Sequence, residues 1–367
     1  MRHTQTAFFY FFSILLSMNI FANIEMLKLD PGFKISIFAS DLDQPRQMIE
    51  SKNGTIFIGE RSGQIIALLD SDGNGQADSK RVIADDLTYS TGVSIFEGDL
   101  YFSEISKIWK IQDIENWLQK NSSGFPEKIL VTQDLPEDKW HGWKWLQHNA
   151  EGDIYTNVGA PCNICISENP QYASIIRLSD DNWEYVARGV RNSVGFDFHP
   201  ETSKLYFGDN GRDWLGDDSP ACELNRVDED GLFYGFPYQH ALNVKDPEYG
   251  DLESGYDYVD PILELGAHVA PTGLAFYDGE MFPKKYKNNI FITLHGSWNR
   301  SKKVGYKVIR VVLDGEGDVV DTKDFISGWL DGEKVLGRPA APLIISDGSL
   351  LISDDKANVI YRITYKQ

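Results

Sequence analysis

The sequence contains little that would build helices or bind a polyanion. Only residues 111–119 show the pattern of a short helix. Lys and Arg number 35 against 55 Asp and Glu, which gives a formal net charge of -20. A surface this acidic repels a phosphate backbone, so general nucleic-acid binding is excluded.

Cysteine is also scarce, with three in 367 residues. Cys162 and Cys165 lie close enough for a short structural disulfide, which an exported protein would favour, although a redox-active pair is the alternative in a cytosolic enzyme. No His follows Cys165, so this is not a c-type haem attachment site. Cys222 is left over, and we expect it to be a buried free thiol.

Long apolar runs are absent except at residues 7–16, just behind Arg2 and His3. A run this short suits a signal peptide better than a membrane span. We therefore predict a signal peptide at 1–22, a mature domain at 28–367, no stable membrane span in the mature form, and a periplasmic or secreted location. An uncleaved anchor is the alternative.

What the chain does contain is a repeated arrangement of short strands. Runs of Val, Ile, Phe and Tyr are separated by turns rich in Gly, Asp and Asn. Six copies, each with an opening strand followed by two more, begin at residues 45, 91, 141, 191, 271 and 338. One such sheet cannot bury both its faces alone, so neighbouring copies must pack together. The pattern predicts an all-β fold, a six-bladed β-propeller around a central channel.

Two further segments fit this arrangement. Residues 33–38 precede the first copy, and we expect them to supply the outer strand of the last blade and to close the ring. The insertions at about 209–222 and 232–270 should form loops over one end of the channel.

Several copies open with a cationic or imidazole side chain, namely Arg46, His141, Arg191 and Arg338. Since inner strands start at one mouth of the channel, these side chains should meet there. Facing arginines repel unless an anion lies between them, and Arg grips planar carboxylates with two hydrogen bonds. We therefore favour a polyanionic ligand at this mouth. The alternative is that each Arg pairs with a local Asp or Glu.

The longest motifs resemble those of a known family. The sequence is similar to the soluble pyrroloquinoline quinone (PQQ)-dependent sugar dehydrogenases, especially their sorbosone dehydrogenase-like branch, from about Gly32 to Tyr365. The stretches that carry the resemblance are His141-Gly142-Trp143-Lys144, Gly159-Ala160-Pro161-Cys162-Asn163-Ile164-Cys165, Arg191-Asn192-Ser193-Val194-Gly195-Phe196, Asp209-Asn210-Gly211-Arg212-Asp213-Trp214-Leu215-Gly216-Asp217-Asp218, Glu223-Leu224-Asn225 and His295-Gly296-Ser297-Trp298-Asn299-Arg300.

The resemblance implies oxidation of a sugar or a sugar-derived aldehyde or hemiacetal, with PQQ and Ca²⁺ as cofactors. It makes His141 the general base and Arg191 the group that stabilises charge on the quinone oxygen. The remaining cofactor contacts that it implies are Arg46, Asn299, Arg300 and Arg338 at the carboxylates and His295 at the ring. Electrons would pass to a separate acceptor such as a cytochrome or quinone, because the chain has no haem motif.

The same resemblance implies that the backbone carbonyls of Gly211 and Arg212 bind Ca²⁺, with Asp213 as a further candidate ligand. Relatives often have Gly-Pro at this turn, whereas this chain has Gly-Arg. Residues 70–78 begin like an EF-hand loop, but position twelve is Arg81 rather than Glu, so an Asx-rich turn is the preferred interpretation.

Two other classes of function remain open. One is a metal-dependent lactonase-type propeller hydrolase, which would need carboxylate ligands on the channel axis. The other is a non-catalytic propeller that binds a carbohydrate or a partner. Four aromatic residues could stack on a sugar ring or belong to the core: Trp143, Trp214, Tyr234 and Trp298.

Overall fold

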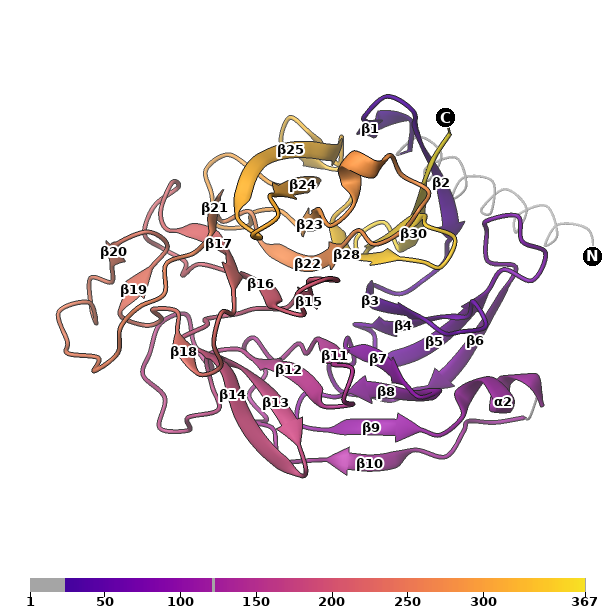
Figure 1. Cartoon of the computed structure of the whole chain (residues 1–367), viewed down its shortest axis with the longest axis horizontal. Coiled ribbons are helices and arrows are strands. Elements are labelled where there is room, and N and C mark those ends of the chain that lie inside the picture. The colour runs from indigo at the N-terminus through magenta and orange to yellow at the C-terminus, as the bar shows by residue number, and fades with distance from the viewer. Residues whose placement is uncertain (1–23, 121–122, 367) are drawn as a thin grey trace, which may run out of the picture.

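Six sheets, antiparallel except for one parallel pair in blade three, surround a central axis in the computed structural model (Figure 1). The structure describes residues 24–120 and 123–366, so the predicted signal peptide lies outside the described residues. The six-bladed propeller is confirmed. In the part of the chain that is described, no helix is long and apolar enough to span a bilayer.

The first three blades run in chain order from the inner to the outer strand. The innermost strands β3, β7 and β11 lie nearest the middle of Figure 1. Blade one contains β3 (Pro45–Glu50), β4 (Ile56–Glu60), β5 (Gln64–Leu69) and β6 (Ser79–Ala84). Blade two contains β7 (Val93–Phe96), β8 (Asp99–Ser103), β9 (Ile108–Ile111) and β10 (Ile129–Thr132), with helix α2 (Ile114–Gln119) between the last two. Blade three contains β11 (Leu146–His148), β12 (Ile154–Val158), β13 (Ser174–Ser179), β14 (Asn182–Arg188) and β18 (Leu232–Phe233).

The last three blades follow the same order, except that the outermost strands of blades five and six come from the N-terminal segment. Blade four contains β15 (Phe196–Phe198), β16 (Leu205–Asp209), β17 (Ala221–Arg226) and β21 (Leu263–Ala267). Blade five contains β22 (Pro271–Phe276), β23 (Ile290–Leu294), β24 (Lys307–Leu313), β25 (Val319–Ser327) and β1 (Lys28–Leu29), with a 3-10 turn at Lys284–Tyr286. Blade six contains β28 (Pro339–Ile344), β29 (Leu350–Asp354), β30 (Val359–Tyr365) and β2 (Phe33–Ala39). Two small hairpins lie outside the blades, β19 (Gln239–His240) with β20 (Val244–Lys245), and β26 (Leu330–Asp331) with β27 (Lys334–Val335).

The ring closes as the sequence predicted. Strand β2 pairs antiparallel with β30, so the N-terminal strand completes the last blade. Phe38 of β2 is 4% exposed and belongs to an apolar cluster that joins blade six to blade one through Leu351, Ile360, Ile56 and Ile66. Closing the ring therefore buries apolar surface as well as pairing two strand edges.

Two of the predicted inner strands begin later than expected. The sequence placed His141 and Arg191 at the start of strands, but β11 begins at Leu146 and β15 at Phe196. His141 has a positive φ of 52°, which no strand adopts. Because His148 lies near the turn after the opening strand of the third copy, the sequence predicts that it is exposed. This prediction is wrong: His148 lies in β11, half-buried, with its Nδ1 2.6 Å from Ser94 Oγ.

Replacing Phe38 with Ala should lower the free energy of unfolding by roughly 3–5 kcal/mol, because the substitution leaves a cavity between the first and last blades. Urea unfolding followed by far-ultraviolet circular dichroism measures the loss. Phe125 is 54% exposed, so Phe125→Ala is the matched control and should change stability by less than about 0.5 kcal/mol. Equal losses in both variants would contradict the closure described here.

Candidate active site

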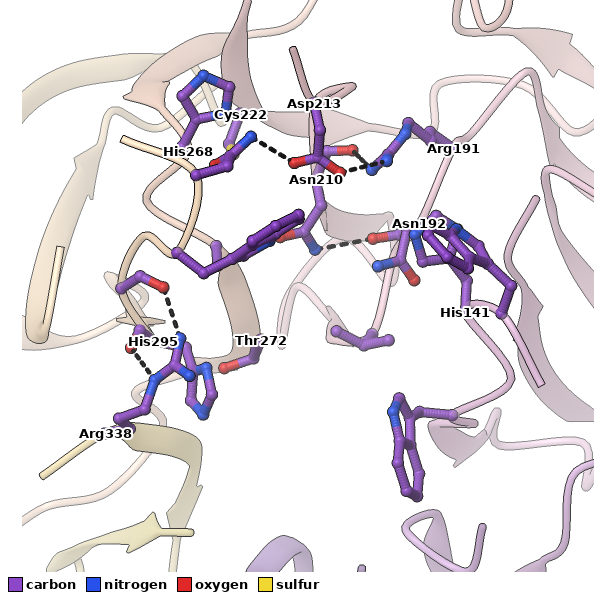
Figure 2. Close-up of a pocket in the computed structure, with 18 of the residues that line it drawn as sticks. His141, Arg191, Asn192, Asn210, Asp213, Cys222, His268, Thr272, His295 and Arg338 are labelled. Atoms are coloured by element: carbon purple, nitrogen blue, oxygen red, sulfur yellow. Dashed lines mark hydrogen bonds and ion pairs between the residues drawn. The ribbon is translucent and has the colours of Figure 1, made fainter. Parts of the chain in front are cut away.

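One mouth of the channel gathers side chains from blades that are distant in the sequence. The start of each inner strand and the end of the second strand lie at the same end of an antiparallel pair, as in Pro45 opposite Glu60 and Pro339 opposite Asp354. Residues that flank these positions line a cavity of about 380 Å³ (Figure 2). The sequence-predicted site residues among the lining are Arg46, His141, Arg191, Gly211, Asp213, His295, Asn299 and Arg338.

Two of the predicted residues point elsewhere. The Arg212 side chain is buried against Asp246, to which it donates a hydrogen bond. Arg300 donates to the backbone carbonyl of Asp217 and pairs with Asp218 at 2.8 Å. Neither arginine is among the residues that line the cavity. The expectation that Arg300 contacts a cofactor carboxylate is therefore not supported by its position.

His141 is held in one tautomer. Its Nδ1 lies 2.8 Å from the carbonyl oxygen of Ala160, which can only accept, so Nδ1 carries the proton in the neutral ring. The lone pair is then on Nε2. A Cβ at Gly159 would lie 2.5 Å from the Cβ of His141, so glycine is needed for this close approach. Burial, together with the charge of Arg191, lowers the pKa of His141 to about 3.

Arg191 is buried, with its side chain 4% exposed, and all three guanidinium nitrogens have partners. Nε donates to the Asn163 carbonyl at 2.9 Å and Nη1 to the Asn210 carbonyl at 3.0 Å. Nη2 donates to Asn163 Oδ1 at 2.8 Å and to Asp213 Oδ2 at 3.1 Å. Figure 2 shows Arg191 and Asp213 facing each other. This network holds the guanidinium in one position.

Two buried acids support the backbone at this side of the cavity. Asp209 accepts from the backbone N–H of Arg191 at 2.8 Å and of Asn192 at 2.7 Å. Burial raises the pKa of Asp209 to about 6. Glu223 is opposite Asp209 in the strand register, and burial together with the charge of Asp209 raises its pKa. The turn that carries Arg191 is thus anchored by side-chain acceptors instead of a strand ladder.

On the other side, Asp355 brings three groups together. It pairs with Arg46 at 2.7 Å and Arg61 at 3.3 Å, and His295 Nε2 donates to it at 2.8 Å. Burial alone would raise the pKa of Asp355, but the charge of Arg46 and the His295 contact hold it far below its usual range. Burial lowers the pKa of His295 to about 4, so its ring is neutral near pH 7. Arg46 therefore pairs with a local carboxylate, which the sequence left open as the alternative to a bound anion.

Arg338 keeps an uncompensated charge. Its Nε donates to the His295 carbonyl at 3.1 Å and its Nη2 to the Gly296 carbonyl at 2.6 Å. Among the described residues, no carboxylate lies within ion-pair distance of it. Figure 2 shows Arg338 and His295 across the cavity from His141. A cationic group faces the cavity here without an anionic partner.

Several lining residues were not predicted. They are Arg61, Trp140, Asn192, Val194, Asn210, Cys222, His268, Ala270, Thr272 and Gly296. A signal for some of them exists, because the residue just after the second strand of a blade faces this mouth. Arg61 and Asn210 occupy that position in blades one and four, as His295 does in blade five. Asn192 adjoins Arg191 in a motif that was already recognised.

The cysteines behave as predicted. Cys162 and Cys165 form a disulfide, and Cys222 is a buried free thiol at the cavity wall. Burial raises the pKa of Cys222.

Tryptophans surround the opening of the cavity. Trp298 and Trp214 form an edge-to-face pair with ring centroids 5.3 Å apart, and they are 64% and 67% exposed. Trp140, which is 52% exposed, contacts the edge of His141. Trp143 also lines the cavity. Tyr234 is 5% exposed and belongs to the core, which is the second of the two alternatives that the sequence left open for it.

Among the described residues, one group of three carboxylates lies within 4.8 Å of one another: Asp70, Asp72 and Asp78. Asp70 and Asp72 also accept hydrogen bonds from the backbone N–H of Asn74, as in an Asx-rich turn. This group is not part of the cavity.

Comparison with known proteins identifies the family. The model of the TrAA12-like family matches residues 27–328, so the chain belongs to this family. Its membership confirms the resemblance to soluble PQQ-dependent sugar dehydrogenases. Placement in the sorbosone dehydrogenase-like branch remains a prediction. An uncharacterised protein of Borreliella burgdorferi is 34% identical over 354 residues, covering 93% of this chain and 91% of that protein.

Solved structures share the fold at low identity. The holo form of the PQQ domain of a pyranose dehydrogenase from Coprinopsis cinerea is 19% identical, with a TM-score of 0.76, over 92% of this chain and 97% of that one. The calcium structure of a Trichoderma reesei carbohydrate-active enzyme of family AA12 is 18% identical, with a TM-score of 0.76, over 93% and 97% of the two chains.

The imidazole of His141 should stay neutral well below its ordinary pKa of 6.5, because the buried site disfavours the charged ring. Titration of ¹⁵N-labelled protein by NMR measures this, with His141→Gln to assign the signal. We expect the ring to remain uncharged down to about pH 4. A midpoint near 6.5 would contradict the environment described for this residue.

Proposed function

We propose that this protein oxidises a sugar or a sugar-derived aldehyde, in its hemiacetal or hydrated form, with PQQ and Ca²⁺. The observation that carries the proposal is that the neutral imidazole of His141 lines a cavity with an excess of positive charge. Two carboxylates, Asp355 and Asp213, pair with three of the four lining arginines and none of the described carboxylates pairs with Arg338, which leaves a formal excess of two positive charges. PQQ carries three carboxylates, and such an anion suits this charge.

Unpartnered polar atoms support the fit. Four buried atoms of the lining residues lack a hydrogen-bond partner: Arg46 Nε, Arg61 Nε, Asn192 Oδ1 and Asn299 Oδ1. Buried polar groups without partners are costly, so a polar ligand that reaches them would be stabilised. A quinone with three carboxylates offers acceptors for the two guanidinium donors. The solved neighbour described as a PQQ domain in its holo form supports the same choice.

In this proposal each residue has a defined task. His141 Nε2 removes the proton from the substrate hydroxyl, and the Ala160 carbonyl keeps the ring oriented. Arg191 stabilises negative charge that develops on the ligand oxygen nearest to it. Arg46, Asn299 and Arg338 hold carboxylates, and His295 contacts the ring from the opposite wall. When bound, the quinone supplies the acceptor for the hydride that leaves the substrate carbon.

Calcium would bind beside Asp213. Both oxygens of this carboxylate already accept hydrogen bonds, Oδ1 from Asn299 at 2.6 Å and Oδ2 from Arg191 at 3.1 Å. The backbone carbonyls of Gly211 and Arg212 are therefore the main proposed ligands, with Asp213 adding charge nearby. The calcium structure of the Trichoderma reesei protein supports the presence of this ion.

The competing functions fit the cavity less well. A metal-dependent hydrolase needs several carboxylates on the axis, whereas Asp213 is the one acid among the described residues that line the cavity. A non-catalytic propeller would have no use for a base held in one tautomer. We further propose that residues 1–22 are a signal peptide, that the domain at 28–367 is exported, and that a separate carrier such as a cytochrome or quinone accepts the electrons.

The cofactor-free protein should bind PQQ in the presence of Ca²⁺ and lose it when a chelator is added. Arg338→Ala should weaken binding by roughly 2–5 kcal/mol, because a buried carboxylate loses its charged partner. Titration of the bound quinone absorbance measures both effects. Arg177 in β13 pairs with Glu184 of β14 and with Asp230 in the turn before β18, away from the cavity, so Arg177→Ala is the control. An unchanged dissociation constant for Arg338→Ala would remove this residue from the site.

Replacing His141 with Ala should leave quinone binding nearly intact and reduce turnover by about 10²–10⁴-fold, because positioned proton transfer is lost. His141→Gln should not restore turnover, since an amide does not accept the proton. Dye reduction with a panel of aldoses measures the rates. His148 is half-buried and outside the cavity, so His148→Gln is the control and should retain activity. Full activity of His141→Ala would leave the base unassigned.

A further inference from the structure

One short segment contacts both of the side chains to which the proposed function gives chemical roles. Residues 159–165, here called the disulfide loop, follow β12 and precede β13 by several residues. The segment has no strand of its own, and the disulfide between Cys162 and Cys165 lies within it. Its contacts therefore decide how firmly the two side chains are held.

Asn163 supplies four of these contacts. Its backbone carbonyl and Oδ1 accept from Arg191 Nε at 2.9 Å and Nη2 at 2.8 Å. Oδ1 also accepts from the backbone N–H of Asp213 at 2.8 Å, and Nδ2 donates to the Asp213 carbonyl at 3.1 Å. One asparagine thus fixes the guanidinium and the turn that carries its counter-ion. Because Arg191 is buried, it would have no water to replace these acceptors.

Ala160 contacts the other side chain. Its carbonyl accepts from His141 Nδ1 at 2.8 Å, and its N–H donates to the Arg191 carbonyl at 2.8 Å. A shift of the disulfide loop would therefore disturb His141 and Arg191 together.

The disulfide flanks Asn163, with Cα atoms 6.2 Å apart and three positions separating the cysteines. A bond that closes so short a loop removes little conformational entropy from the unfolded chain, so its main effect is local. Both cysteines are partly exposed, and Cys165 lines a second cavity of about 200 Å³. A small thiol reductant can therefore reach the bond.

We propose that Asn163 is a positioning residue for Arg191, and that the Cys162–Cys165 disulfide locks it in place and makes the site sensitive to reduction. This inference rests on the proposed function of Arg191. An external dithiol would pass two electrons and two protons to the disulfide, giving two thiols here and a disulfide in the reductant. The released loop then loses its hold on Arg191 and Asp213, and the cofactor is bound less tightly.

Quinone binding and kinetics test the positioning role. Asn163→Ala, and the double variant Cys162→Ser with Cys165→Ser, should each raise the quinone dissociation constant and lower kcat by about 10-fold or more. KM for the sugar and the melting temperature should change little, which separates positioning from a general structural role. Asn163→Asp keeps the acceptor for Arg191 and should recover part of the loss.

Asn169, which is exposed and lies just beyond the disulfide loop, supplies the matched control Asn169→Ala, which should behave like the wild type. Unchanged quinone binding and kcat in Asn163→Ala would overturn the proposal. So would a loss in Asn163→Ala that appears only as a lower melting temperature.

A second measurement needs no cofactor. In the cofactor-free protein, reduction should add two titratable thiols and speed amide hydrogen exchange in peptides covering 160–165 and 211–215, while β13 stays protected. If amide exchange is unchanged after reduction has been confirmed, the disulfide does not hold the loop and the proposal is overturned. Faster exchange in a protein that never binds quinone would support the loop's hold on Arg191 and instead overturn the proposed function.

Discussion

The site depends on the antiparallel pairing of the first two strands in each blade. This pairing puts the residue that opens one strand and the residue that follows the next at the same end of the sheet. Repeated around a ring, it brings together groups that are far apart in the chain, such as Arg61 and Asp355, which are 294 positions apart. The charged cavity is thus a consequence of the repeat, and closure by β2 keeps its walls in register.

The repeats made the fold predictable, because short apolar strands between Gly and Asp turns recur along the whole chain. The inner strands of blades three and four were less predictable. Trp145 donates its backbone N–H to the Asn157 side chain at 2.7 Å, so a side chain replaces the ladder and β11 starts only at Leu146. Asp209 acts in the same way on the turn before β15. The pattern of apolar residues in a sequence does not show where a side chain takes the place of backbone strand pairing.

The prediction of the site residues was incomplete for a related reason. Equivalent positions in the repeat identified Arg46, Arg191 and Arg338, but the direction of a long side chain depends on partners outside the repeat. Arg212 turns to Asp246 in an insertion that has no periodicity. Facing arginines need an anion between them, and for Arg46 this anion is Asp355 of the protein itself, the local pairing that the sequence left open. Asn163 belonged to a recognised motif, yet only the structure shows that it contacts Arg191 and Asp213.

Ligand binding and base strength are coupled in this arrangement. Burial and the charge of Arg191 lower the pKa of His141 to about 3, which keeps the ring neutral but makes it a weak base. General-base catalysis is most effective when the pKa lies near the working pH. A bound anion would offset the charge of Arg191, the smaller of these two causes, whereas the larger cause, burial, would remain. The excess positive charge that favours an anionic cofactor would therefore also account for part of the low pKa of His141 until the cofactor is bound.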